Sequence, residues 1–155
     1  MSEEGETAPG AEGGVSTGGC LCGGVRYRAL GPLRPVLACH CAQCRRTSGN
    51  YVTATAVDKS RFAFLNEETL VWYVSSPGVR RGFCSRCGSN LVWDNAARPM
   101  ISIFAGALDG PTGLTLTGHI FCADKGDYYE IGDGLPQHPR ELPDAERLAL
   151  AMRKP

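Results

Sequence analysis

The residues best suited to chemistry are three cysteines in one short stretch of the chain. Cys39, Cys41 and Cys44 place three thiols within six residues. Cys41 and Cys44 have the C-x-x-C spacing at which a tight turn brings two thiolates onto zinc. A tetrahedral zinc takes four ligands, so these three leave one position for water or an incoming ligand, as in catalytic zinc sites. We therefore predict a metal site that is open to a substrate.

Two further pairs of cysteines can form a closed metal site. Cys20 and Cys22 point to the same face if their segment is extended, and Cys84 and Cys87 repeat the C-x-x-C spacing. Four thiolates complete a tetrahedral zinc and leave nothing to react, which makes a structural site that contributes to folding. The spacings leave the pairing open, because the first and second motifs could share one metal instead.

His40 and Cys122 are the other candidate ligands. Along an extended segment the side chain of His40 points away from Cys39 and Cys41, which favours packing or support of the ligands over ligation. Cys122 ends an apolar stretch with strand periodicity, so we interpret it as a buried core thiol. The fourth position of the open site could still be filled by water, by Cys122 or by a small substrate thiol.

The charge of an open three-thiolate site favours sulfur chemistry. Three thiolates exceed the charge of Zn²⁺, so the ion is a poorer acid for bound water than one held by neutral histidines. The same electron-rich environment can keep a substrate thiolate nucleophilic. The sequence has no nucleophile elbow, no phosphate-binding glycine loop and no H-E-x-x-H pattern. Thiol chemistry is therefore favoured over the hydrolysis of peptides or esters.

Charged residues indicate the kind of partner. Arginine is a planar fork that suits carboxylates, and five arginines lie beside cysteine motifs: Arg45, Arg46, Arg80, Arg81 and Arg86. Arg45 and Arg46 directly follow Cys44 and are the candidates for binding a carboxylate of a ligand, although these arginines could also be solvated or balance thiolate charge. The 16 Lys and Arg residues equal the 16 Asp and Glu residues, so no net basic field favours nucleic acid. No apolar run approaches the roughly 20 residues that span a bilayer.

The N-terminus and the cysteine content together predict a reducing, cytoplasmic compartment. The chain begins Met-Ser-Glu-Glu-Gly-Glu, which is acidic and lacks the apolar region of a secretory signal. Eight cysteines in a secreted chain would indicate disulfides, whereas in a cytosolic chain the same spacings indicate metal.

Short strands must position these cysteines. Strand signals, with clear alternation of apolar and polar residues in the first two, mark eight segments: 25–30, 51–57, 61–65, 70–74, 79–83, 91–93, 100–104 and 115–122. We predict eight to ten short strands in all. Residues 45–49 are interpreted as a turn. No helical period is found before Pro143, after which Asp144 could cap a short helix through Arg153. We predict one all-β domain of mainly antiparallel packed sheets, stabilised by zinc, with a short C-terminal helix.

The domain boundaries follow from composition. Residues 1–17 carry four glutamates and almost no large apolar side chain, so we predict a disordered N-terminal tail. Residues 18–138 form the predicted zinc domain, and residues 139–155 form a C-terminal tail with the short helix.

The motifs together resemble the glutathione-dependent formaldehyde-activating enzyme family, which includes centromere protein V-like proteins. The resemblance covers about residues 16–136 and rests on segments that follow in order: Gly19-Cys20-Leu21-Cys22-Gly23, Cys39-His40-Cys41-Ala42-Gln43-Cys44-Arg45, Gly49, Phe83-Cys84-Ser85-Arg86-Cys87-Gly88, Leu108-Asp109, His119-Ile120 and Asp133-Gly134-Leu135-Pro136. It implies an all-β fold with two zinc ions per chain. It assigns a structural zinc to Cys20, Cys22, Cys84 and Cys87, and a second, labile zinc to Cys39, Cys41 and Cys44.

The resemblance also implies an activity. A glutathione thiol would add to formaldehyde, or the carbon–sulfur bond of the adduct S-hydroxymethylglutathione would be cleaved. We therefore predict a carbon–sulfur lyase-type enzyme with a small thiol partner such as glutathione. A homo-oligomer is compatible with this prediction. Two alternatives are a non-catalytic, zinc-stabilised binding module and a redox sensor that releases zinc when the thiols of the second site are oxidised.

Overall fold

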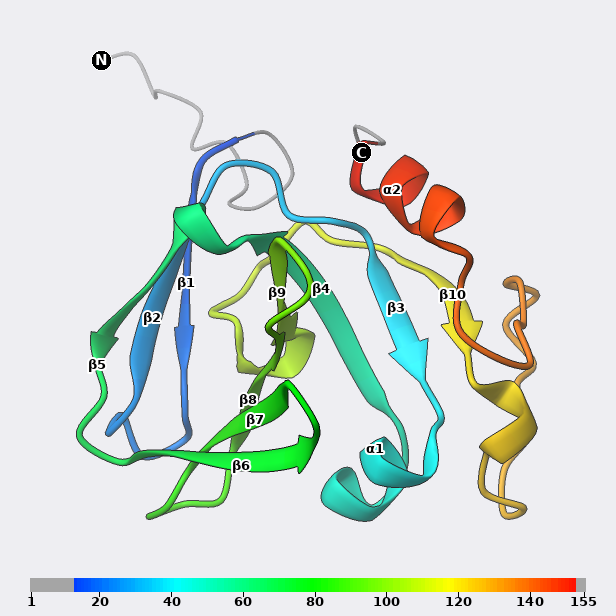
Figure 1. The fold of residues 1–155 in the computed structure, drawn as a ribbon, viewed down its shortest axis with the longest axis horizontal. Coiled ribbons are helices and arrows are strands. Elements are labelled where there is room, and N and C mark those ends of the chain that lie inside the picture. Colours follow the sequence, from blue (N-terminus) through cyan, green and yellow to red (C-terminus); the bar gives the residue numbers. More distant parts are fainter. Residues whose placement is uncertain (1–12, 153–155) are drawn as a thin grey trace.

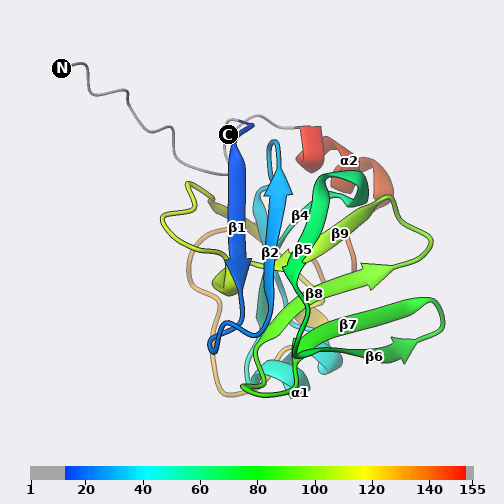
Figure 2. The same cartoon turned by 90° about the vertical axis from the view of Figure 1, so that its left-hand side faces the viewer.

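The computed structural model describes residues 13–152 and places their strands in two sheets (Figure 1). The smaller sheet has the order β1-β2-β5, and both of its pairings are antiparallel. Figure 2 shows these three strands side by side. They are β1 (Val15–Gly19), β2 (Arg26–Leu30) and β5 (Phe62–Asn66).

The larger sheet has seven strands in the order β10-β3-β4-β9-β8-β7-β6. Only β10 and β3 pair in parallel; the other pairs are antiparallel. Its strands are β3 (Val36–Cys39), β4 (Val52–Asp58), β6 (Leu70–Ser76), β7 (Val79–Cys84), β8 (Asn90–Asn95), β9 (Met100–Phe104) and β10 (Leu116–Ile120). The predicted all-β, mainly antiparallel fold is therefore confirmed, and each of the eight predicted strands has a counterpart.

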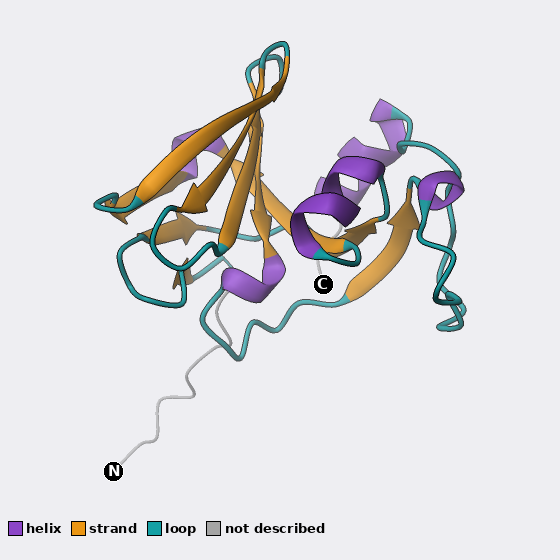
Figure 3. Ribbon diagram, turned by 90° about the horizontal axis from the view of Figure 1, so that it is seen from below, coloured by secondary structure: helices purple, strands orange, loops and turns teal. Residues whose placement is uncertain are grey.

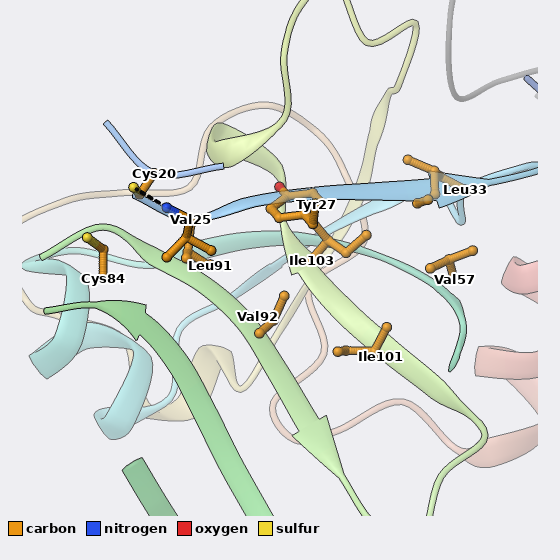
Figure 4. Packing of buried hydrophobic residues seen from close by; sticks show 11 residues of the cluster. Cys20, Val25, Tyr27, Leu33, Val57, Cys84, Leu91, Val92, Ile101 and Ile103 are labelled. Carbon is orange, nitrogen blue, oxygen red and sulfur yellow. Dashed lines mark hydrogen bonds between the residues drawn. The ribbon is translucent and has the colours of Figure 1, made fainter. Parts of the chain in front are cut away.

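The main hydrophobic core joins the two sheets (Figure 4). Tyr27 of β2, Leu91 of β8 and Ile103 of β9 are fully buried in one cluster. A large apolar side chain that is fully buried contributes roughly 1.5–3 kcal/mol relative to an exposed one. Cys20 and Cys84 belong to the same cluster of buried residues, so two of the candidate ligands lie in the core.

Helix α1 (Ala42–Ser48) corrects the predicted turn at residues 45–49. It has only seven residues, which is too short to show a helical period in the sequence. Cys41 is its N-cap and accepts a hydrogen bond from the Cys44 N–H. Gly49 ends it with a left-handed φ of 84°, a conformation that glycine adopts without strain.

Helix α2 (Asp144–Met152) confirms the predicted C-terminal helix within the described residues. Figure 1 places α1 and α2 near opposite ends of β3, and Figure 3 shows how little of the chain is helical. Leu148 and Met152 of α2 are exposed, whereas Leu142, just before the helix, is buried and anchors this segment. No helix among residues 13–152 is both long enough and apolar enough to cross a bilayer.

The N-terminal boundary and the end of β10 both differ from the prediction. Strand β1 begins at Val15, which pairs with Leu30, so the predicted disordered tail extends too far; residues 1–12 lie outside the described part of the chain. The strand predicted to reach Cys122 ends at Ile120 instead. Phe121 adopts a left-handed φ of 54°, which turns the chain out of the sheet.

Candidate metal centres

The first cysteine cluster has the geometry of a closed four-thiolate site. Cys20, Cys22, Cys84 and Cys87 have all four sulfur atoms within 4.8 Å of one another. The Cys20 and Cys22 sulfurs lie 3.6 Å apart, and those of Cys22 and Cys84 lie 3.7 Å apart. Tetrahedral zinc separates its sulfur ligands by about 3.8 Å, whereas a disulfide needs about 2.05 Å. All four thiols are free, so the cluster fits a metal ion.

Hydrogen bonds to sulfur hold this first cluster in place. The Val25 N–H donates to Cys20 Sγ over 3.2 Å, and the Cys87 N–H donates to Cys84 Sγ over 3.4 Å. Hydrogen bonding, chiefly to the side chain of Ser89, lowers the pKa of Cys87 to about 5. Donors of this kind stabilise thiolates, which are the form of cysteine that binds metal. The cluster joins the turn between β1 and β2 to the end of β7.

The second cluster has three thiols and lies where β3 passes into α1. The sulfur atoms of Cys39, Cys41 and Cys44 are within 4.8 Å of one another, and no other His, Cys, Asp or Glu of residues 13–152 joins them. Hydrogen bonding from Cys39 and then Cys44 lowers the pKa of Cys41 to about 2, while the pKa of Cys39 is raised by the same contacts. The close approach of the three thiols therefore favours a thiolate at Cys41 at neutral pH. Three sulfur atoms at this spacing fit a metal ion.

Arg81 of β7 supports the second cluster. Its side chain is 7% exposed, and its Nη1 and Nη2 atoms lie 3.8 and 3.9 Å from Cys44 Sγ. Nη2 also donates to Gln43 Oε1 over 3.0 Å. A buried guanidinium beside a thiolate offsets its negative charge. Strand alternation could have singled out Arg81, because its neighbour Arg80 is exposed on the opposite face.

A cavity of about 490 Å³ opens from the three thiols. This volume lies within the range of small-molecule sites. Its wall includes apolar side chains of the large sheet, among them Trp93 and Phe104, and four arginines: Arg34, Arg81, Arg98 and Arg147.

The predicted binding residues Arg45 and Arg46 do not line this cavity. They belong to α1 rather than to a turn. The structure therefore brings together Cys39, Cys41 and Cys44, as predicted, but with a different set of arginines.

His40 lies in a buried polar network. Its Nε2 is 2.9 Å from His119 Nδ1, and its Nδ1 contacts the hydroxyl of Tyr129. His119 Nε2 in turn lies 2.7 Å from Asp133 Oδ2. Burial, and then the proximity of His119, lowers the pKa of His40 to about 4. His40 is not a member of the cysteine cluster, which agrees with its predicted role in packing.

Cys122 lies beyond β10 in a single 3-10 turn and is partly buried. It belongs to neither cysteine cluster and to neither hydrophobic core cluster. The interpretation as a core thiol is therefore corrected, because the chain leaves the sheet at Phe121. Ligation of the second metal by Cys122 gains no support from this placement.

The fold and the two clusters define a mostly β protein with candidate cysteine metal sites, and comparisons with known proteins narrow this class. The sequence model of a family described as "Glutathione-dependent formaldehyde-activating enzyme" matches residues 15–124. A Halomonas elongata protein that is also named as a glutathione-dependent formaldehyde-activating enzyme is 33% identical over 125 residues. The match covers 74% of this chain and 79% of the relative. The chain therefore belongs to the glutathione-dependent formaldehyde-activating enzyme family.

A solved structure supports the fold. The crystal structure of a Rhodobacter sphaeroides protein superposes with a TM-score of 0.54, covering 65% of this chain and 99% of the other. The two sequences are 21% identical, so the likeness concerns the fold alone.

Proposed function

We propose that this protein is a zinc-dependent carbon–sulfur lyase-type enzyme that acts on adducts of glutathione, or a related thiol, with an aldehyde such as formaldehyde. One observation carries the proposal. The first cluster offers four sulfur ligands, whereas the second offers three and opens onto a cavity of substrate size. A closed site beside an open one is the arrangement expected of one structural and one catalytic zinc.

The residues of the second site would have distinct tasks. Cys39, Cys41 and Cys44 would hold the zinc, which when bound supplies an open coordination position for a substrate thiol. Arg81 balances the negative charge that gathers at Cys44. Trp93 and Phe104 give the cavity an apolar wall that limits the access of water.

The proposed reaction is balanced without a redox partner. In the direction of cleavage, the carbon–sulfur bond of the adduct breaks and its electron pair stays on sulfur. The adduct's hydroxyl group loses its proton as the carbonyl of the aldehyde forms. Negative charge thus develops on the substrate sulfur, and a buried guanidinium such as that of Arg81 stabilises charge at this place.

The proposal includes two zinc ions per chain, one structural and one labile. Both clusters need reduced thiols to bind metal. The proposal therefore retains the prediction of a reducing, cytoplasmic compartment, with glutathione as the small-molecule partner.

The test is the rate of exchange between glutathione and S-hydroxymethylglutathione, measured by exchange NMR against the uncatalysed rate. We expect acceleration by the protein and its loss in Cys44→Ser, with one zinc per chain retained. The matched control is Cys122→Ser, which should keep the acceleration because Cys122 lies outside both clusters. Full activity of Cys44→Ser would contradict the proposal. Two zinc ions that both resist a mild chelator, without acceleration, would favour the non-catalytic binding module.

A further inference from the structure

Three arginines gather in the wall of the cavity that holds the cysteines. Arg34 precedes β3, Arg98 lies between β8 and β9, and Arg147 belongs to α2. Arg34 is 7% exposed and donates from Nη2 to the carbonyl of Ala54 over 2.9 Å. The Nε atoms of Arg34 and Arg147 are buried and have no hydrogen-bond partner among residues 13–152. Such donors are costly to leave unpaired, so they indicate a missing acceptor.

Positive charge exceeds negative charge at this place. Glu141 is the carboxylate of the group: its Oε1 accepts a hydrogen bond from Arg98 Nη2 over 2.8 Å and another from Arg147. Burial, followed by the charges of Arg147 and Arg98, lowers the pKa of Arg34 to about 10. Asp124 also lines the cavity but pairs with Arg140, at 3.6 Å. Two guanidinium groups therefore share one carboxylate oxygen, whereas Arg34 has no carboxylate partner among residues 13–152. A second carboxylate would be attracted to this group of arginines.

We infer that Arg34, Arg98 and Arg147 form a carboxylate-binding subsite of the cavity, so that the ligand is a thiol compound with a carboxylate remote from its sulfur. The inference that the ligand carries a thiol rests on the proposed function. The inference that the ligand carries a carboxylate rests on the three arginines alone. Guanidinium groups bind carboxylates through paired, charge-assisted hydrogen bonds. In this subsite the carboxylate of Glu141 holds the arginines ready and is the group with which an incoming carboxylate competes.

The C-terminal segment completes the subsite. Arg147 and Glu141 lie beyond residue 124, where the match to the family model ends. The metal ligands all lie within the match. Selection of the ligand's carboxylate therefore depends on a part of this chain that the shared family sequence does not supply.

The test measures the binding of a ligand that has the carboxylates of glutathione but no free thiol. S-Methylglutathione keeps both carboxylates of glutathione but has no free thiol, and its diethyl ester has neither charge. We expect titration calorimetry on the zinc-loaded protein to detect S-methylglutathione but not its diethyl ester. Arg98→Gln and Arg147→Gln should each weaken binding about tenfold, as expected for the loss of a charged hydrogen bond. The matched control Arg80→Gln should leave binding unchanged, because Arg80 pairs with Asp94 outside the cavity.

The outcomes separate this inference from the proposed function. Binding that needs Arg98 and Arg147, without any acceleration of thiol exchange, would retain the subsite and overturn the lyase proposal. Equal binding of S-methylglutathione and its diethyl ester, or unchanged binding in both arginine variants, would overturn the subsite whatever the activity. Near-ultraviolet circular dichroism and zinc content should show that each variant is folded. Arg34 is left intact, because its backbone and side chain both bond to β4.

Discussion

A single residue, Arg81, links the second cysteine cluster to the sheet. Its guanidinium is buried, contacts Cys44 Sγ and bonds to Gln43, while its backbone belongs to β7. It is therefore placed to fix the start of α1, from which two of the three thiols project. Residues that support metal ligands in this way commonly change metal affinity without touching the metal.

We expect Arg81→Gln to weaken the second metal site. Loss of the charge beside Cys44 should lower the affinity for the labile zinc about tenfold or more, since supporting contacts typically contribute that much. Competition with a colorimetric zinc chelator measures the change, and the first zinc should stay bound. Arg80→Gln is the control on the same strand. Equal chelator competition in the two variants would show that Arg81 has no part in holding the metal.

Local spacing made the cysteine clusters predictable, whereas the polar residues around them were not. The second cluster can be predicted because its three cysteines, Cys39, Cys41 and Cys44, lie within six residues of the sequence. The hydrogen-bond partners of His40 are His119 and Tyr129. His119 is brought near by the pairing of β10 with β3, and Tyr129 by the loop that follows β10. No short-range pattern in the sequence encodes such contacts.

Among the elements, the strands were more predictable than the helices. Alternation of apolar residues marks a strand in few residues, whereas α1 is shorter than two full helical turns, so its sequence predicts only a turn. Strand β1 is rich in glycine, serine and threonine, so it lacks the apolar signal and was assigned to the tail. Neither pattern identifies Arg34, Arg98 and Arg147, because they belong to separate segments that only the fold brings to one cavity.

The segment that includes Glu141 and α2 should affect how tightly the cavity binds a ligand with a carboxylate. We expect Glu141→Gln to strengthen the binding of S-methylglutathione about threefold, because it removes a competing carboxylate whose ion pairs are partly exposed and therefore modest. Titration calorimetry measures the effect. Glu68→Gln, which breaks an ion pair with Arg86 away from the cavity, is the control and should have no effect. Weaker binding in Glu141→Gln would mean that Glu141 only holds the arginines in place.

At the scale of the whole molecule, the two metal sites differ in what depends on them. The first cluster ties the turn after β1 to the end of β7, and two of its cysteines lie in the main core. The second lies in a separate, smaller cluster around Cys44, Val52 and Phe104. Loss of the first metal should therefore affect both sheets, and loss of the second only the surroundings of the cavity.

We expect Cys84→Ser to prevent folding and Cys44→Ser to leave the fold intact. Binding of a structural zinc contributes roughly 10–16 kcal/mol in small domains, which is as large as the whole stability of a typical protein. Circular dichroism during heating measures both variants. A cooperative transition for Cys84→Ser near that of the unaltered protein would show that the first cluster is not structural.

The parallel pairing of β10 with β3 separates the two sites in time as well as in space. All four ligands of the first cluster have been synthesised once Cys87 is made. The loop that carries Cys39 and Cys41 is different, because the His40 N–H donates to the carbonyl of Ile120 over 3.0 Å and β3 has β10 as its outer neighbour. During translation, all the ligands of the first cluster are therefore present before β10, which borders the loop of the second cluster, has been synthesised. We therefore expect the three thiols of the second cluster to be synthesised before Cys84 and Cys87 but to be fixed in position only after β10 has formed.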